Sequence, residues 1–465
     1  MQNGFHRLRR IRSRWWVVAF GCALFLAFLP QCKRVRALVD RTPAQRLEPT
    51  HLAATHTAVL EIQRRRQPLP SLRDGLRDFR CIFHAHAEDS VHTGGTRPEM
   101  LADAIKAGVH AIFLSDHFRP PRDFMDSWRG LRDGVLFIPG SEVRGFLAHP
   151  TNSVLDHMDA PVTNFVNAMG AGEGLLFLSH IEERPDHSME NLSGLEIYNR
   201  HYDAKRDIAG LIAIAMKLTA PESLATFSRL VQEFPDEVLA CQVRRQEAYL
   251  DKWDQETAQG RRLTGIAAND CHHNQVLIVK MIDTNTVAVG TIVDKDESLR
   301  RVTATLRPGI RTMTQGHQAG DILARVDLDP YYRSFRNVST HVLASELTEP
   351  ALRAALRAGR AYVAHEWICD ATGFRFDVAQ GASITSRTAA LMGGELTLEP
   401  GLHLRIETPV SCVIRLLRNG QEVAQVEGRE WIHRLTEPGI YRCETAFVIH
   451  GELREWIYSN PIYVR

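Results

Sequence analysis

The sequence lacks a charge imbalance. Its 56 lysines and arginines nearly cancel its 55 aspartates and glutamates, so the formal net charge at pH 7 is +1. Proteins that hold nucleic acid by its phosphates normally carry a basic surplus, and no stretch here combines basic with aromatic side chains. The composition therefore argues against nucleic acid as a partner. Internal repeats and low-complexity tracts are also missing, and 465 residues allow two or three folded domains.

Long hydrophobic runs are scarce, and the one that stands out lies near the N-terminus. Residues 15–30 are apolar and follow five arginines between His6 and Arg14. This length is near the lower limit for a spanning helix, and the positive-inside rule places the arginine-rich end in the cytoplasm. We predict an uncleaved signal anchor that holds the chain in the membrane and leaves its bulk outside the cytoplasm, in the periplasm or at the cell surface. The alternatives are a cleaved signal peptide, which would release a secreted protein, and a buried cytoplasmic helix.

The order of strand-like and helix-like segments divides the rest of the chain. Strand–helix units between residue 79 and about residue 285 are typical of an α/β barrel, whose site lies at the C-terminal ends of the strands. After Arg333, short alternating strands and turns such as Asn419-Gly420 predict a β-sandwich-like domain. We predict four segments: a basic segment with a signal anchor (1–39), a stalk or linker with some helix (40–78), a metallo-barrel (79–332) and the β-sandwich-like domain (333–465).

Cysteine is also sparse, with eight residues in the chain. Cys81, Cys241 and Cys271 lie in predicted strands or helices, where a buried thiol is expected. In an exported C-terminal part, Cys369, Cys412 and Cys443 allow one disulfide, although the sequence does not pair them.

Histidine, by contrast, is concentrated in one region. Twelve of the 21 histidines lie between His84 and His273, and several end a short apolar run, as in Cys81–His86, Ala111–His117 and Leu175–His180. Such runs describe buried parallel strands that deliver side chains to one common face. Imidazole and carboxylate groups gathered at one point are metal ligands.

Nine ligand-type residues follow this pattern. On a strand, His84 and His86 point to the same side, because side chains alternate with a period of two. A lone strand histidine is usually structural, but nine such groups at one pole of a barrel predict a metal site. The predicted ligands are His84, His86, His92, His117, Glu142, His180, His201, Asp270 and His272.

The order of these motifs resembles the polymerase and histidinol phosphatase (PHP) superfamily of metal-dependent phosphoesterases. His-x-His, a histidine six residues later, Ser-Asp-His, Pro-Gly-x-Glu, a strand-end histidine, Glu-Ile-x-Asn with a following histidine, and Asn-Asp-x-His occur in that order between residues 79 and 285. The resemblance implies a distorted (β/α)7 barrel with two or three divalent transition metals, usually zinc, manganese or iron.

The resemblance also implies how the ligands are shared among the metals. One metal would lie among His84, His86, Glu142 and Asp270. Glu142 would bridge to a second metal, and a third would lie near His117 and the substrate phosphate. In this scheme His92 and His180 hold the second metal, and His201 and His272 complete the set.

Further residues are candidates for supporting roles. Asp116, Asn199 and Asn269 are expected to orient ligands. His149 is either a substrate-binding or acid residue or an ordinary loop histidine. Three arginines follow ligand-bearing strands and would either fork onto a phosphate or form surface ion pairs; they are Arg119, Arg144 and Arg200.

The leading functional hypothesis is hydrolysis of a small phosphate ester by a metal-activated water, with Glu142, Asp270, Asp116 and His149 as the catalytic candidates. A phosphodiesterase or nuclease is the second hypothesis, and the near-zero net charge argues against it. An amidohydrolase-type site would need a bridging lysine on a middle strand, and none stands at these strand ends. The last hypothesis is a membrane-tethered, non-enzymatic binding protein. The sequence indicates no protein partner.

Overall fold

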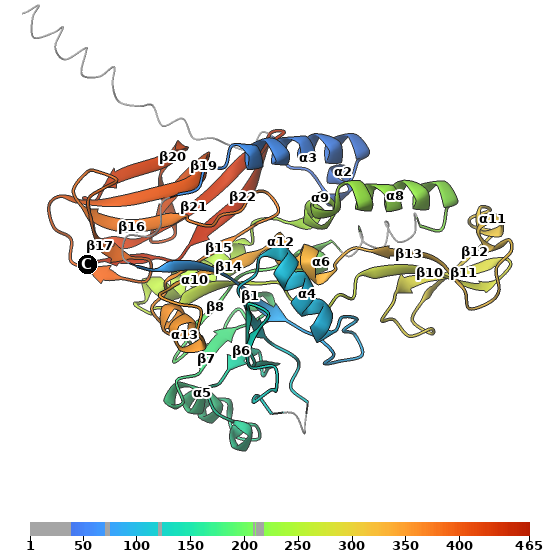
Figure 1. The fold of residues 1–465 in the computed structure, drawn as a ribbon, viewed down its shortest axis with the longest axis horizontal. Helices are drawn as coiled ribbons and strands as arrows, with labels where there is room; N and C mark the ends of the chain where they lie inside the picture. Colours follow the sequence, from blue (N-terminus) through green and yellow to red (C-terminus); the bar gives the residue numbers. More distant parts are fainter. Residues whose placement is uncertain (1–38, 70–74, 120–122, 208–209, 211–217) are drawn as a thin grey trace, which may run out of the picture.

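The computed structural model describes residues 39–69, 75–119, 123–207, 210 and 218–465. It shows a mixed α/β fold whose strands form one 14-stranded, one five-stranded and one four-stranded sheet (Figure 1). The predicted membrane segment, residues 15–30, lies outside the described residues. Among the residues that are described, no helix is long and apolar enough to cross a membrane.

Strands and helices follow one another between Arg77 and Ala268, but five described strands from Ala111 to His149 come in succession instead of alternating with helices. The elements are β1 (Arg77–Ala85), α4 (Arg97–Ala107), β2 (Ala111–Leu114), β3 (Gly130–Arg132), β4 (Val135–Ile138), β5 (Ser141–Val143), β6 (Phe146–His149), α5 (Val162–Ala171), β7 (Leu175–Leu178), β8 (Gly194–Asn199), α6 (Arg200–Arg206), α8 (Pro221–Glu233), α9 (Pro235–Leu239), α10 (Glu247–Ala258) and β9 (Thr264–Ala268). Local sequence signals set the ends of helix α4: Thr96 and Glu99 form a capping box at its start, and Gly108, in a left-handed conformation, ends it.

Two groups of parallel strands position the site. Strands β1, β2 and β4 run parallel in the large sheet, and β7, β8 and β9 run parallel in the five-stranded sheet. A bridge between Ala85 and Cys271 joins the end of β1 to the segment after β9, and a bridge between His117 and Glu142 joins the segment after β2 to β5. The C-terminal ends of these strands therefore meet on one side.

Two further features depart from regular strand–helix units. Strand β6 runs antiparallel to both β5 and β7, so its C-terminal end lies at the opposite side from theirs. In addition, the sequence of residues 236–259 reads as one continuous helix, but the structure divides it into α9 and α10. Between these helices Arg46 donates hydrogen bonds to the carbonyls of Cys241 and Val243, which a continuous helix would have bonded internally.

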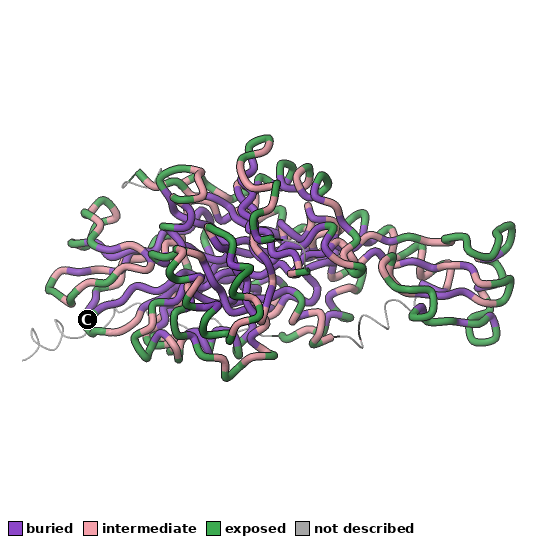
Figure 2. Tube along the Cα trace, turned by 90° about the horizontal axis from the view of Figure 1, so that it is seen from below, coloured by how far each residue is buried: buried purple, intermediate pink, exposed green. Residues whose placement is uncertain are grey.

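Residues 276–327 form a separate arm that the sequence analysis included in the barrel. The arm is an antiparallel sheet in the order β12-β11-β10-β13 with its own apolar core. It projects from the body of the molecule, and its far end is mostly exposed (Figures 1 and 2). Its elements are β10 (Val276–Asp283), β11 (Thr286–Thr291), β12 (Arg300–Thr303), α11 (Ile310–Thr314) and β13 (Ile322–Asp327).

The C-terminal part is mostly antiparallel strand, as predicted. Its hairpin at Asn419-Gly420 is confirmed: both residues have positive φ, 52° and 78°, as a type I′ turn requires. The elements are α12 (Tyr331–Asn337), β14 (Ser339–Ala344), α13 (Glu349–Arg357), β15 (Ala361–Ala364), β16 (Arg375–Gln380), β17 (Arg387–Leu391), β18 (Glu395–Leu396), β19 (Leu402–Arg418), β20 (Gln421–Arg434), β21 (Gly439–Ile449), β22 (Glu452–Ser459) and β23 (Ile462–Val464).

The C-terminal strands are continuous with the strands that carry the site. β14 pairs antiparallel with the first half of β1, from Arg77–Ala344 to Cys81–Thr340, and β15 pairs with both β14 and β22. One apolar core also includes Trp253 from α10 and Trp456 from β22. Around residue 332 the chain therefore changes from mixed strands and helices to mostly antiparallel strands, within one sheet and one core. Figure 2 shows this core as a continuous buried interior.

The linker segment is docked on this body. Helices α2 (Pro43–Arg46) and α3 (Pro49–Arg64) precede β1, and His56 of α3 lies 2.7 Å from Glu237 of α9. The six described cysteines are all free and buried. Cys369, Cys412 and Cys443, for which the sequence allowed one disulfide without specifying a pair, are among these free thiols.

Candidate metal centre

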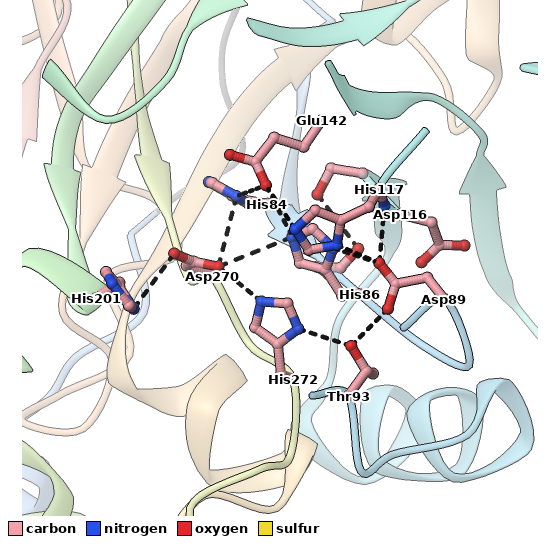
Figure 3. A network of polar contacts seen from close by, with 12 residues as sticks. His84, His86, Asp89, Thr93, Asp116, His117, Glu142, His201, Asp270 and His272 are labelled. Carbon is pink, nitrogen blue, oxygen red and sulfur yellow. Dashed lines mark hydrogen bonds and ion pairs between the residues drawn. The ribbon is translucent and has the colours of Figure 1, made fainter. Parts of the chain in front are cut away.

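The predicted ligands assemble around two carboxylates (Figure 3). Glu142, on β5, is the first. One of its oxygens, Oε2, lies 3.4 Å from Nε2 of both His84 and His117 and 3.7 Å from Nε2 of His86. The other, Oε1, lies 3.1 Å from Nε2 of His180. A single carboxylate thus faces imidazoles from three different strand ends.

Asp270, just after β9, is the second carboxylate. Its Oδ1 lies 3.1 Å from Nε2 of His272 and 3.5 Å from Nε2 of His84. Its Oδ2 lies 3.6 Å from Nε2 of His180 and 3.8 Å from Nδ1 of His201. His84 and His180 therefore lie between the two carboxylates.

The backbone bends sharply at three of these residues. His84, His180 and Asp270 have positive φ angles of 57°, 48° and 46°, which side-chain-bearing residues seldom adopt. At His84 the register of β1 shifts between Phe83 and Ala85. Regular alternation along a strand predicts that the side chains of His84 and His86 point to the same side. Instead, a bulge turns His84 inward, and His86 follows the end of the strand. Such conformations persist where the surrounding structure holds them, commonly at functional sites.

His201 also arrives by a different route from the one predicted. The sequence of residues 194–201 reads as one strand that ends at His201, but β8 ends at Asn199, and His201 lies in the first turn of α6. The Asn199 side chain caps this helix by accepting a hydrogen bond from the backbone N of His201 at 2.8 Å. Asn199 therefore fixes the helix start that brings His201 toward Asp270.

Two buried carboxylates that the sequence analysis did not select hold the imidazoles from behind. Glu196 accepts a hydrogen bond from Nδ1 of His84 at 2.7 Å. Asp89 accepts hydrogen bonds from Nδ1 of His86 at 3.0 Å and Nδ1 of His117 at 2.6 Å. Because a carboxylate only accepts, each of these Nδ1 atoms carries the proton, and each Nε2 is directed at the centre.

This arrangement fits bound metal ions. Nε2 of both His84 and His86 is buried without a hydrogen-bond partner among the described residues. In the neutral imidazole each presents a lone pair toward carboxylate oxygens, which repel it unless a cation lies between them. Two of the groups close enough to hold an ion are His84–His86–Asp270 and His84–Glu142–His180.

Protons and metals compete for these lone pairs. Burial would lower the pKa of His84, but Asp270, Glu142 and Glu196 together raise it well above its ordinary value. Burial would raise the pKa of Glu142, but the charge of His84, whose Nε2 lies 3.4 Å away, and a hydrogen bond from His180 hold it well below the usual range. Glu142 is therefore ionised, and metal-free His84 gains a proton that a metal must displace, so metal affinity at His84 increases as pH rises.

His92 lies on a different side of the centre from His180. Its ring lies 4.9 Å from the rings of both His117 and His272, whereas the ring of His180 lies 5.2 Å from that of His84. The loop that carries His92 is fixed by hydrogen bonds from the backbone N of Gly94 and Gly95 to the carbonyl of His272. This geometry groups His92 with His117 and His272, which differs from the grouping that the resemblance implied.

A cavity of about 260 Å³ opens onto the centre. Besides the ligand-type residues, its lining contains Glu183, Arg184 and Asn274. Arg184 donates to the carbonyl of Ser179 at 3.3 Å and lies 3.4 Å from Glu183. It is the arginine of the cavity wall, and the sequence analysis missed it because it follows β7 by way of a short 3-10 turn.

The three arginines predicted to bind substrate do not line this cavity. Arg144 donates to the carbonyl of Met158, and Arg200 is buried and donates to Gln275. Arg119 is exposed, and adds to the effect of burial, His272 and His117 in lowering the pKa of His92.

His149 and Asp116 lie away from the cavity as well. His149 is at the end of antiparallel β6 and pairs with Leu175, the first residue of β7, so it is at the opposite pole from the strand ends that bear ligands. It is fully buried against Phe83 and Phe113, and burial with Arg353 lowers its pKa to about 3. The structure thus separates His149 from the centre, in contrast to its predicted catalytic role.

Asp116 and Asn269 have structural contacts. Asp116 forms an ion pair with Arg97 of α4 and accepts from the backbone N of Ala87 at 2.9 Å, which fixes the loop after β1. Asn269 donates to the carbonyls of Ser334 and Val338. Both residues position the chain that carries ligands.

Several solved structures resemble this chain, and one of them is as follows. The crystal structure of a two-domain protein from Bacteroides vulgatus, described as containing a predicted PHP-like metal-dependent phosphoesterase, is similar with 15% sequence identity and a TM-score of 0.35. The alignment covers 85% of this chain and 98% of that chain. No protein-family model and no curated protein matches the sequence.

Proposed function

We propose that the protein is a metal-dependent hydrolase that cleaves phosphate esters on a distorted (β/α)7 barrel of the PHP type. The supporting observation is the pair of carboxylates, Glu142 and Asp270, with imidazole nitrogens from several strand ends within 3.8 Å. Partnerless Nε2 atoms on His84 and His86 add to this support. Such a set suits two or three divalent ions of zinc, manganese or iron.

The residues of the centre would have different roles in the reaction. Bound divalent ions would activate a water and stabilise the charge of a phosphoryl group. Glu142 would fix the separation of two ions, because its two oxygens face different histidines. Asp89 and Glu196 would hold the imidazole tautomers. Arg184 and Asn274, on the cavity wall, would orient the substrate phosphate.

The dimensions of the cavity favour a small substrate. Its volume, about 260 Å³, is below the range typical of drug-sized ligands. A phosphate monoester with a compact leaving group fits this space better than a polymer, and the net charge of +1 offers no attraction for nucleic acid. Phosphodiester cleavage is the second candidate, and comparing turnover of a phosphate monoester with that of a phosphodiester separates the two.

The decisive test combines metal analysis with a substrate panel. Purified full-length protein should contain one to three transition-metal ions per chain, and chelation should remove metal and activity together. Zinc or manganese should restore both. Turnover of an aryl phosphate should exceed that of an aryl phosphodiester. Absence of metal, with no rescue by added zinc or manganese, would overturn the proposal.

Glu142→Gln provides the sharpest variant. It keeps the size of the side chain but removes the charge that faces His84, His117 and His180, so turnover should fall by orders of magnitude while circular dichroism stays unchanged. His110→Gln is the matched control, since His110 accepts a hydrogen bond from the backbone N of Arg80 and lies outside the cavity lining. Its turnover should remain within a few-fold of wild type. Near-normal turnover of Glu142→Gln would contradict the bridging role.

A further inference from the structure

A second cavity, of about 230 Å³, is lined mainly by arginines. It lies where the linker, the end of α6, the segment before α10 and β22 meet, and it shares no lining residue with the metal centre. We call it the arginine pocket. Its arginines are Arg46, Arg206, Arg244, Arg245 and Arg454.

The buried positive charge of the arginine pocket exceeds the buried negative charge beside it. The side chains of Arg46 and Arg454 are 7% and 6% exposed. Both depend on one carboxylate, Glu452, which lies 3.0 Å from Arg46 and 4.0 Å from Arg454. Burying a charge without a counter-charge is costly, so two buried guanidinium groups that share one carboxylate favour an additional anion.

The remaining contacts of these two arginines do not neutralise them. Arg46 donates to the carbonyls of Cys241 and Val243, and Arg454 donates to the carbonyl of Ala240. A carbonyl satisfies a hydrogen bond but carries no net charge. Burial and the nearby charge of Arg46 accordingly lower the pKa of Arg454 to about 9.

Among the other arginines, Arg245 is neutralised by buried Glu444 at 2.9 Å, whereas Arg206 and Arg244 leave donors available. Nε of Arg244 is buried and has no hydrogen-bond partner among the described residues. The contact described for Arg206 is with the ring of Tyr202. The acids of the lining do not compensate, because Asp40 and Glu247 are exposed and Glu455 already pairs with Arg415.

We propose that the arginine pocket binds a phosphate-type oxyanion. Guanidinium groups match a tetrahedral oxyanion by paired N–H donors, and several of them converge here. The volume accommodates a phosphate group with a small substituent. The anion is either a soluble phosphate or the phosphate of a lipid headgroup, since Asp40 in the lining lies ten residues after the predicted membrane segment 15–30.

The test uses full-length protein in detergent after chelation, so that the metal centre cannot contribute. Calorimetric titration with inorganic phosphate at constant ionic strength should show saturable binding to one site. A double variant, Arg206→Ala with Arg244→Ala, should weaken this binding about tenfold or more. Arg229→Ala is the control, because Arg229 lies on α8 and pairs with Glu233 at 3.0 Å; it should bind as wild type.

A second variant keeps the proposal testable if the double variant is unstable. Arg454→Met removes the surplus buried cation while retaining the length of the side chain. It should be at least as stable as wild type without phosphate, and phosphate should no longer raise its Tm. Absence of saturable phosphate binding by wild type, or unchanged binding by both variants, would overturn the proposal. Phosphatase activity has no part in these measurements, so the proposed function can fail independently.

Two further ligands identify the source of the anion. Glycerol 3-phosphate and a short-chain phosphatidic acid carry the same phosphate chemistry, with and without acyl chains. Equal affinities would indicate a soluble phosphate, and tighter binding of the phosphatidic acid would indicate a lipid headgroup. Binding of neither compound would count against the pocket.

Discussion

Glu196 shows how one residue can organise a centre without facing the cavity. It is fully buried, and its two oxygens accept from Nδ1 of His84 at 2.7 Å, from the backbone N of His180 at 2.9 Å and from Nδ2 of Asn199 at 2.9 Å. The carboxylate thus sets the tautomer of one candidate ligand and the backbone of another.

Replacing Glu196 with Gln should weaken metal binding while the fold is retained. The amide keeps the shape, but it removes a charge and allows the His84 ring to change tautomer. Loss of such a partner typically reduces metal affinity about 10- to 100-fold. Chelator competition with zinc would measure the change. Glu190→Gln, at an exposed position nearby, should leave the affinity unaltered; equal affinities in all three proteins would contradict the role of Glu196.

Most of the ligand-type residues were predictable because they lie at the ends of recognisable apolar runs, whereas His92, in a loop, was predictable only from the order of the motifs. Asp89 was not, because it lies in the loop after His86, where no periodic pattern marks it. His149 was misassigned because the sequence does not reveal that β6 runs antiparallel. The predicted substrate-binding arginines, Arg119, Arg144 and Arg200, lie outside the cavity lining for a related reason. Proximity to a strand end in the sequence does not determine the direction of a long side chain.

At the scale of elements, β1, β14 and β15 are joined by a buried network of charges. His341 on β14 lies 2.6 Å from both Asp78 on β1 and Glu366, just after β15. Arg80 of β1 lies 2.8 Å from Glu366 and 3.1 Å from Asp370. Burial would lower the pKa of His341, but Asp78 and Glu366 raise it to about 9, so the imidazole is protonated at neutral pH.

Stability should therefore decrease as pH rises above neutrality. A histidine whose pKa is raised by folding stabilises the native state fully below its unfolded pKa, near 6.5, and this contribution is lost as pH rises through about 9. Urea unfolding between pH 6 and pH 9.5 would measure the loss. His341→Gln should be less stable than wild type at pH 6, and the difference should shrink toward pH 9.5. A difference that stays constant with pH would refute a charged His341.

Elements with local signals were predictable, and elements that depend on distant partners were not. The capping box of α4 and the turn at Asn419-Gly420 are encoded within a few residues. The pairing of β14 with β1 joins segments far apart in the chain, and nothing local specifies it. The arm formed by β10–β13 escaped prediction because its strands resemble barrel strands in composition.

At the scale of the whole molecule, the arm projects from one side of the described body, and the linker helices α2 and α3 pack over that body (Figure 1). The backbone N of Val39, the first described residue, donates to the carbonyl of Gly451, so the linker joins the body immediately. We propose that residues 15–30 anchor this body to the membrane on its extracytoplasmic side.

Reporter fusions test this topology. Alkaline phosphatase fused after Arg465 should be active, because it matures only outside the cytoplasm, and a cytoplasmic fluorescent reporter at the same position should be dark. Deleting residues 1–38 is the control and should reverse both signals. An inactive alkaline phosphatase with a bright reporter on the full-length chain would place the body in the cytoplasm.

The ladder between β1 and β14 also affects when the protein can mature. The strand that carries His84 gains a neighbour on one side only after residues 339–344 have been synthesised. Folding that waits for such distant contacts is slow. A nascent chain would therefore remain open through most of its synthesis. Under the membrane anchoring proposed above, this open state is the one that an export channel accepts, and the metal centre would form only after release outside the cytoplasm.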